Sequence, residues 1–146
     1  MERSTDLNAD EQARRDLLMR HPVIAVVGRS DNPTAVSYEV AQYLEEHGFT
    51  VYSVNPRINE VDGKPSYASL KDIPAPVDIV DVFRNPDVLP EIVDEAIAIG
   101  ANSVWGQLGV TNDAARAKAL AAGLNYADGI CIRAEHKRQF PRGGQG

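Results

Sequence analysis

The sequence has little of the residue types on which disulfide frameworks and metal sites depend. Its 146 residues include one cysteine, Cys131, and three histidines. A single cysteine excludes an internal disulfide framework and suits the reducing cytosol, and no paired metal-ligand spacing such as H-E-x-x-H occurs. No apolar run approaches the roughly 20 residues of a membrane span, and the charged N-terminus lacks the apolar segment of a secretory signal. We therefore expect a cytoplasmic protein with no membrane partner.

Positive charge is also scarce. The chain has 15 Lys and Arg residues against 21 Asp and Glu residues, which gives a formal net charge of −6. A general nucleic-acid-binding surface is basic, so we expect no nucleic-acid partner. An anionic ligand would bind such a protein only where positive groups are concentrated locally, and the sequence must therefore be searched for a small basic cluster.

Strand-like and helical patterns alternate along the chain. Because parallel strands need crossover helices, this alternation predicts an α/β fold, a Rossmann-type doubly wound parallel sheet of about five strands with helices on both faces. Apolar and β-branched runs predict strands, and apolar residues at helical spacing predict helices. The predicted strands are 23–27, 50–54, 77–83, 102–107 and 124–128, and the predicted helices lie within 34–48, 86–100, 111–123 and 131–140.

These elements form one predicted domain over residues 21–140. We expect a helical extension over residues 1–20 before it and a flexible tail over 141–146 after it. The stretch 55–76 is expected to be a loop with a turn at Asp62-Gly63 and about one helical turn near Ser69. Ligands of doubly wound sheets bind beyond the carboxyl ends of the strands, so the loops after the first three strands are the candidate site.

Each of these three strand ends carries an arginine. Arg29 follows the first strand, Arg57 the second and Arg84 the third. Arginine is always charged, and its planar guanidinium binds phosphate through paired hydrogen bonds. Surface loops also carry arginine by chance, but three arginines on one rim of an acidic protein favour an anion site.

The loop "IAVVGRSDNP" after the first strand begins like a dinucleotide-binding fingerprint but lacks its second and third glycines. Gly28 leaves room for a phosphate to approach the backbone, and Ser30 adds a hydroxyl donor. Asn32-Pro33 is typical of a helix entry, with a capping residue followed by proline. The alternative interpretation is structural, with Gly28 forming a tight turn and Ser30 capping a helix.

The end of the second strand discriminates between cofactors. An NAD site usually has Asp or Glu there to bind the adenosine ribose hydroxyls. This sequence has Asn55, Pro56 and Arg57 instead. A missing carboxylate and a nearby guanidinium favour a phosphorylated ribose, which is either the 2′-phosphate of NADP or the 3′-phosphate of coenzyme A (CoA).

The segments "VVGRSDNP", "VYSVNPR", "VDIVDVFR", "VWGQLGV" and "DGICIRAEHKR" together resemble the single-domain CoA-binding proteins. Their fold is similar to the N-terminal CoA-binding domain of the succinyl-CoA synthetase α subunit. The resemblance extends from about Val23 to Phe140 and implies CoA or acyl-CoA as the ligand. It implies cofactor contacts from Gly28, Arg29 and Ser30 at the pyrophosphate, from Asn55, Pro56 and Arg57 at the phosphorylated adenosine, from Phe83 and Arg84 at the adenine or the start of the pantetheine arm, and from Gln107 at the distal part of the ligand.

No catalytic constellation is evident in the sequence. "GRSDN" lacks the second glycine of the G-x-S-x-G nucleophile motif, and Asp78 and Asp81 lie three apart in one strand, on opposite faces, where capping and helix-end contacts explain them. We expect His136 on a solvated helical face. Cys131 is expected to be a buried structural thiol rather than a group that exchanges with the CoA thiol.

Two functional classes follow from these observations. We expect a non-catalytic module that binds CoA or acyl-CoA as a carrier, sensor or regulatory partner. The alternative is an NADP-dependent reductase or a CoA-dependent enzyme with an unrecognised catalytic group. A reductase needs room for nicotinamide and usually a substrate domain, for which 146 residues are few. A protein partner or a homo-oligomer is compatible with the sequence, which identifies neither.

Overall fold

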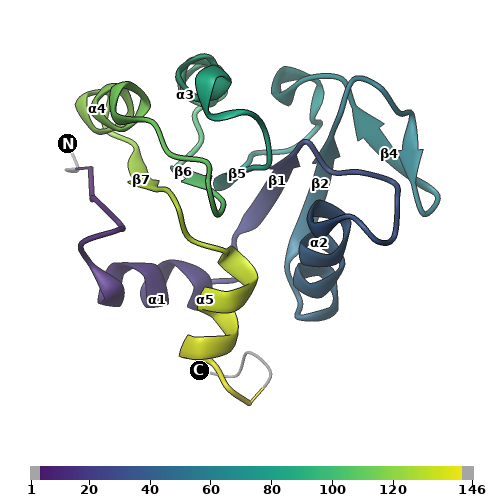
Figure 1. The fold of residues 1–146 in the computed structure, drawn as a ribbon, viewed down its shortest axis with the longest axis horizontal. Coiled ribbons are helices and arrows are strands. Elements are labelled where there is room, and N and C mark those ends of the chain that lie inside the picture. The colour runs from purple at the N-terminus through teal and green to yellow at the C-terminus, as the bar shows by residue number, and fades with distance from the viewer. Residues whose placement is uncertain (1–3, 143–146) are drawn as a thin grey trace.

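The computed structural model describes residues 4–142, which fold around a seven-stranded sheet (Figure 1). The strand order is β3-β4-β2-β1-β5-β6-β7, and only the β3–β4 pairing is antiparallel. The predicted doubly wound α/β fold is therefore confirmed, with seven strands rather than about five. The strands are β1 (Val23–Val27), β2 (Thr50–Val54), β3 (Glu60–Val61), β4 (Lys64–Tyr67), β5 (Ile79–Val82), β6 (Ser103–Gly106) and β7 (Asn125–Ala127).

Helices cover both faces of this sheet (Figure 1). On one face, α3 and α4 pack on side chains such as Ala25, Val80 and Val104. On the other face, α1, α2 and α5 pack on side chains such as Ile24 and Trp105. The central strands are buried on both faces, as parallel strands usually are. The helices are α1 (Glu11–Met19), α2 (Val36–Glu46), α3 (Leu89–Ala98), α4 (Asp113–Ala121) and α5 (Ile132–Gln139), with short 3-10 turns η1 (Leu70–Asp72) and η2 (Pro86–Val88).

The strand order reverses direction at β1. The chain moves from β1 to β2 on one side, and after the β3–β4 hairpin it crosses back to β5 on the other side of β1. The connections that leave β1 and β5 therefore diverge to opposite faces of the sheet, which leaves a crevice at their carboxyl ends. This topology brings the loops after β1, β2 and β5 together, as the sequence predicts.

The N-terminal residues are integrated into the domain. Asp6 forms a parallel bridge to Tyr126 at the β7 edge, and Leu7 beside it is buried. The helix α1 packs on α5 through an ion pair between Arg14 and Glu135, whose Nε and Oε2 atoms are 2.8 Å apart. Of the predicted tail 141–146, residues 143–146 lie outside the described residues.

Two local expectations differ from the structure. The stretch 55–76 contains the β3–β4 hairpin, which turns at Asp62-Gly63, where a turn is predicted but not the strands around it. The α2 helix begins at Val36 after an Ala35 cap, so Asn32 does not cap it; the Asn32 side chain instead accepts a hydrogen bond from the Thr34 N–H within the loop. No helix among residues 4–142 is long and apolar enough to cross a membrane.

Candidate ligand-binding site

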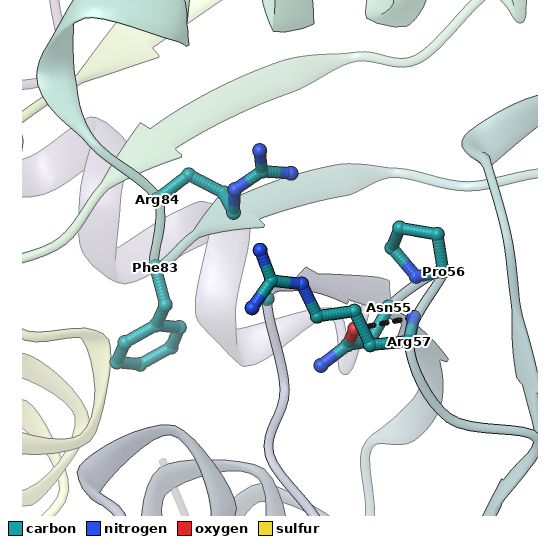
Figure 2. Close-up of a pocket in the computed structure, with 6 residues that line it drawn as sticks. Asn55, Pro56, Arg57, Phe83 and Arg84 are labelled. Carbon is teal, nitrogen blue, oxygen red and sulfur yellow. Dashed lines mark hydrogen bonds between the residues drawn. The ribbon is translucent and has the colours of Figure 1, made fainter.

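A pocket of about 400 Å³ lies at the carboxyl ends of β1, β2 and β5. This volume is within the range of small-molecule and cofactor sites. Figure 2 shows the guanidinium groups of Arg57 and Arg84 converging on the space between the β2 and β5 loops. The structure thus brings six of the nine residues expected at the site into one pocket, which is lined by Gly28, Asn55, Pro56, Arg57, Phe83 and Arg84.

Hydrogen bonds fix the β1 and β2 loops of the pocket to each other. The Asn55 side chain donates to the Arg29 carbonyl at 3.0 Å, and its Oδ1 accepts from the Arg57 N–H at 3.0 Å (Figure 2). The Gly28 N–H donates to the Val54 carbonyl at 2.7 Å. Both polar ends of the Asn55 amide are therefore engaged with the backbone, and Asn55 acts as a brace between the β1 and β2 loops.

Gly28 allows the β1 loop to approach the end of β5 closely. Its φ is +93°, and a Cβ on it would lie 2.6 Å from the Phe83 carbonyl oxygen and 3.2 Å from Arg84 Cδ. Both the left-handed backbone and the missing side chain are thus required here. The sequence predicts that Gly28 leaves room for a phosphate, and the structure shows that the residue also allows two loops of the pocket to approach each other closely.

Among residues 4–142, the two pocket arginines have no acidic partner, whereas five of the other eight arginines do. The paired ones are Arg14, Arg29, Arg116, Arg133 and Arg138. Both pocket arginines are exposed. The pocket therefore has positive charge available for a ligand on a protein whose net charge is −6.

The side chain of Arg29 does not reach the pocket, contrary to expectation. It is buried, with Nη1 donating to Ser53 Oγ at 3.1 Å and lying 3.5 Å from Glu45 Oε2, and its guanidinium lies over the Tyr38 ring. Its charge is balanced by Glu45, and the side chain anchors the β1 loop to β2 and α2 on the side away from the pocket. Among the predicted contacts at the pyrophosphate, only Gly28 lines the pocket.

Ser30 and Gln107 also lie outside the pocket lining. The Ser30 N–H donates to Ser37 Oγ, and its hydroxyl accepts from the Asn32 N–H, which are local loop contacts. Gln107 is buried at the end of β6, where its Nε2 donates to Asp81 Oδ1.

Asp81, two residues before Phe83, is a buried acid that does not line the pocket and that the sequence did not identify. Its carboxyl is fully buried in β5, and burial raises its pKa to about 8 despite the hydrogen bond from Gln107. The interpretation of Asp81 as a capping or helix-end residue is wrong. Asp78 does have a capping contact, because its side chain accepts a hydrogen bond from the Val23 N–H at the start of β1, at 2.8 Å. The available signal was an acid within the apolar run "VDIVDVF".

His136 is also placed differently from its prediction. It is 1% exposed rather than solvated, and its Nδ1 lies 2.6 Å from the Tyr43 hydroxyl. Burial, together with the positive charges of His47 and His21, lowers the pKa of His136 to about 4. Cys131 is partly buried at the start of α5. Among residues 4–142, no group of histidine, cysteine and acidic side chains is arranged to hold a metal ion.

A doubly wound sheet with a basic pocket at its switch point defines a nucleotide-binding class of α/β domain. Residues 22–137 match the family model described as the CoA binding domain. The chain belongs to this CoA-binding domain family, which confirms the resemblance inferred from its motifs.

The relatives include proteins of similar length and much larger ligases. The uncharacterized protein YneT of Bacillus subtilis is 34% identical over 129 residues, which are 88% of this chain and 96% of that protein. A solved structure of a hypothetical protein from Pyrococcus horikoshii is 39% identical with a TM-score of 0.87, covering 96% of this chain and 99% of that one. The α subunit of ADP-forming acetate–CoA ligase II from Pyrococcus furiosus is 47% identical over 57 residues, 38% of this chain but only 12% of the subunit.

Proposed function

We propose that this protein binds CoA or an acyl-CoA in the pocket at the ends of β1, β2 and β5, and that it does so as a binding module without catalysis of its own. The observation that carries the proposal is the pair Arg57 and Arg84, which have no acidic partner among residues 4–142, beside the close backbone turn at Gly28. Membership of the CoA-binding domain family supports the choice of ligand.

The β2 end supports a ligand with a phosphorylated ribose. Asn55 occupies the place where an NAD site has an acid, but its amide is engaged by the Arg29 carbonyl and the Arg57 N–H. It therefore offers no carboxylate to ribose hydroxyls. The exposed guanidinium of Arg57, two residues further on, lines the pocket, which supports its pairing with a phosphate on the sugar.

The burial and the contacts of the two ionisable groups with strongly shifted pKa values support the non-catalytic role. Asp81 and His136 have strongly shifted pKa values, which often mark catalytic residues. Both side chains, however, are buried, and each already contacts another side chain, Gln107 and Tyr43 respectively. Neither side chain lines the pocket. The ligase relatives contain several times the length of this chain, so their chemistry is not transferred to it.

Ligand-dependent thermal stabilisation tests the proposal. CoA, 3′-dephospho-CoA, NADP and NAD are compared at matched concentrations, where a ligand at 100 times its Kd stabilises a protein by about 2.7 kcal/mol. We expect CoA to give the largest shift in Tm and 3′-dephospho-CoA a smaller one. A larger shift with NADP would identify a dinucleotide site instead, and no shift with CoA would refute the proposal.

Arg57→Ala tests which phosphate the arginine recognises. A charge-assisted hydrogen bond contributes about 1.5–3 kcal/mol, so we expect roughly tenfold or greater weakening for CoA and little change for 3′-dephospho-CoA in calorimetric titrations. Arg20→Ala is the matched control, because it removes an exposed arginine near the amino ends of β1 and β5, away from the pocket. Equal losses for both ligands would mean that Arg57 does not recognise the 3′-phosphate.

A further inference from the structure

The loop after β5 carries Arg84 and is fixed at its start. The Phe83 N–H donates to the Val27 carbonyl at 2.8 Å, which joins the end of β5 to β1. Beyond Phe83 the hydrogen bonds of the loop are local, such as the bond of 2.8 Å from the Asp87 N–H to the Asn85 side chain, which shapes the η2 turn. A local bond fixes the form of a turn but not its position on the domain.

One side chain from another loop holds the far end of this segment. Asn112, the residue before α4, donates from Nδ2 to the Pro86 carbonyl at 3.0 Å. Within the part of the chain that the structure describes, this is the one hydrogen bond that joins residues 84–88 to a distant segment. Pro86 follows Arg84 by two residues, so the loop is fixed on both sides of Arg84, at Phe83 and at Pro86.

Asn112 can hold the loop because its own orientation is fixed. Its Oδ1 accepts from the Ala115 N–H at 3.0 Å, which makes Asn112 the N-cap of α4, and its backbone N–H donates to Asp128 Oδ2 at 3.4 Å. The two ends of the side-chain amide therefore have separate tasks. The oxygen caps the helix, and the nitrogen is directed at the Pro86 carbonyl. Capping alone would be served equally well by aspartate or serine, which have no amide nitrogen.

The position of this loop determines where the charge of Arg84 lies. A Cβ on Gly28 would lie 3.2 Å from Arg84 Cδ, so the stem of Arg84 packs beside the β1 loop. Figure 2 shows the guanidinium of Arg84 directed into the same space as that of Arg57. If the loop were free at one end, the ligand would have to order it, and that ordering would reduce the affinity. A loop that is fixed at both ends has already lost this freedom.

We propose that Asn112 is a positioning residue, which holds the β5 loop through the Pro86 carbonyl and so keeps the guanidinium of Arg84 in place for a phosphate of the ligand. The inference rests on the proposed function, because it requires a phosphate of CoA to bind Arg84. Asn112 itself does not line the pocket and acts through Arg84. The start of α4 thereby takes part in binding, although none of the residues of that helix lines the pocket.

Asn112→Ser separates the two tasks of Asn112. Serine is as good an N-cap as asparagine, so α4 keeps its cap, but serine has no amide nitrogen to donate to Pro86. We expect CoA binding to weaken about fivefold in calorimetric titrations at pH 7, which is the effect of one net hydrogen bond. Unchanged CoA affinity in Asn112→Ser would overturn the inference.

Two control variants show whether a lost hydrogen bond or lost stability is enough to weaken binding. Asn125→Ser makes the same chemical change at the start of β7, away from the pocket, where the Asn125 side chain accepts from the Thr5 N–H at 2.8 Å. Arg116→Ala removes the ion pairs of α4 to Asp6 and Asp128 but leaves the bond to Pro86 in place. We expect both controls to bind CoA within twofold of the wild type. A fivefold loss in either control would show a general effect of destabilisation and would refute the role of Asn112.

Double mutants test whether Asn112 acts through Arg84. Arg84→Ala alone should weaken CoA roughly tenfold or more, the effect of a charge-assisted hydrogen bond. Asn112→Ser added to Arg84→Ala should cause less than a twofold further loss, because both changes act on the same guanidinium. Added to Arg57→Ala, it should still weaken CoA several-fold, because Arg57 lies on the β2 loop. A fivefold further loss in the Arg84→Ala background would indicate a structural role only and would overturn the inference.

The wild type and Arg84→Ala separate this inference from the proposed function. If the wild type binds no CoA, the proposed function fails, and the inference fails with it. If Arg84→Ala weakens CoA but Asn112→Ser does not, the phosphate site stands and the positioning role is refuted. If Arg84→Ala leaves CoA affinity unchanged, CoA can still bind through Arg57, but Asn112 has no phosphate contact to position and the inference is again refuted.

Discussion

Asp81→Asn tests the protonation of the buried carboxyl through its effect on stability. Burial in β5 raises the pKa of Asp81 from 3.8 to about 8, whereas the unfolded chain has the ordinary value. Between these pH values the folded protein holds a proton that the unfolded chain has released. The free energy of unfolding therefore falls as pH rises toward 8, and below pH 3.8 this loss is absent.

The size of the effect follows from the shift. Each pH unit between the two pKa values corresponds to about 1.4 kcal/mol, so at pH 7 the cost of keeping the carboxyl protonated is about 4 kcal/mol. Asparagine is neutral in both states and has no such cost. Its NH₂ group takes the position of Oδ2, which has no partner among residues 4–142, and adds a constant penalty of about 1–3 kcal/mol that does not depend on pH. The stability of Asp81→Asn relative to wild type should therefore rise steadily from pH 4 to 8.

The assay is urea unfolding of both proteins at half-unit steps from pH 4.5 to 8. His136 contributes an opposite slope, because its folded pKa of about 4 lies below its ordinary 6.5 and stability is lost as pH falls from 6.5 toward 4. This contribution is common to both proteins and cancels in their difference. Between pH 6.5 and 8 the wild type alone should lose stability. Parallel stability curves for the two proteins would refute a protonated Asp81.

Two further predictions concern Gly28 and the N-terminal segment. Gly28→Ala should destabilise the fold by about 2–4 kcal/mol and weaken CoA binding, because it combines a φ of +93° with a clash at the Phe83 carbonyl. Gly63→Ala is the control for backbone strain alone, because Gly63 has a φ of +81° and open space around it. Equal losses of Tm in the two variants would contradict the clash. Arg116→Ala should lower the free energy of unfolding in urea by about 1–3 kcal/mol, because it removes the ion pairs to Asp6 and Asp128, and should leave CoA affinity unchanged. Lys118→Ala is the control, because it removes an exposed ion pair and should change stability little. An equal loss in Lys118→Ala would contradict the reasoning.

The sequence predicts the central strands well because their signals are local. β1 and β2 match their predicted bounds at both ends, since each is a run of apolar or β-branched residues between turn residues. The hairpin was missed for the converse reason. Glu60–Val61 is only two residues long, and Lys64–Tyr67 contains a proline and polar residues, so neither has a strand pattern. β4 exists because it pairs with β2, a contact that local sequence does not encode.

The candidate site was predictable at the level of the backbone but not of every side chain. Topology alone places the ends of β1, β2 and β5 together, and therefore Arg57 and Arg84 share a pocket. The Arg29 side chain lies below the loop because Ser53 and Glu45 offer it partners there. Its direction depends on the course of the loop, which has too few glycines to match a known fingerprint. The position of a residue in the sequence determines that it lies at the carboxyl ends of the strands. The packing around it determines whether its charged group points into the pocket or away from it.

The pocket combines a rigid backbone with side chains that are free to bind. The Gly28 N–H bond to Val54, the Asn55 amide and the close contact at Phe83 hold three loops in place before any ligand arrives. A ligand therefore has little loop ordering to offset, and its binding energy is reduced mainly by the side-chain entropy of Arg57 and Arg84. Had these arginines been paired with carboxylates like Arg29, the ligand phosphates would have to compete with those acids. A preorganised backbone with unpaired guanidinium groups is the arrangement that a polyanionic nucleotide needs on an acidic protein.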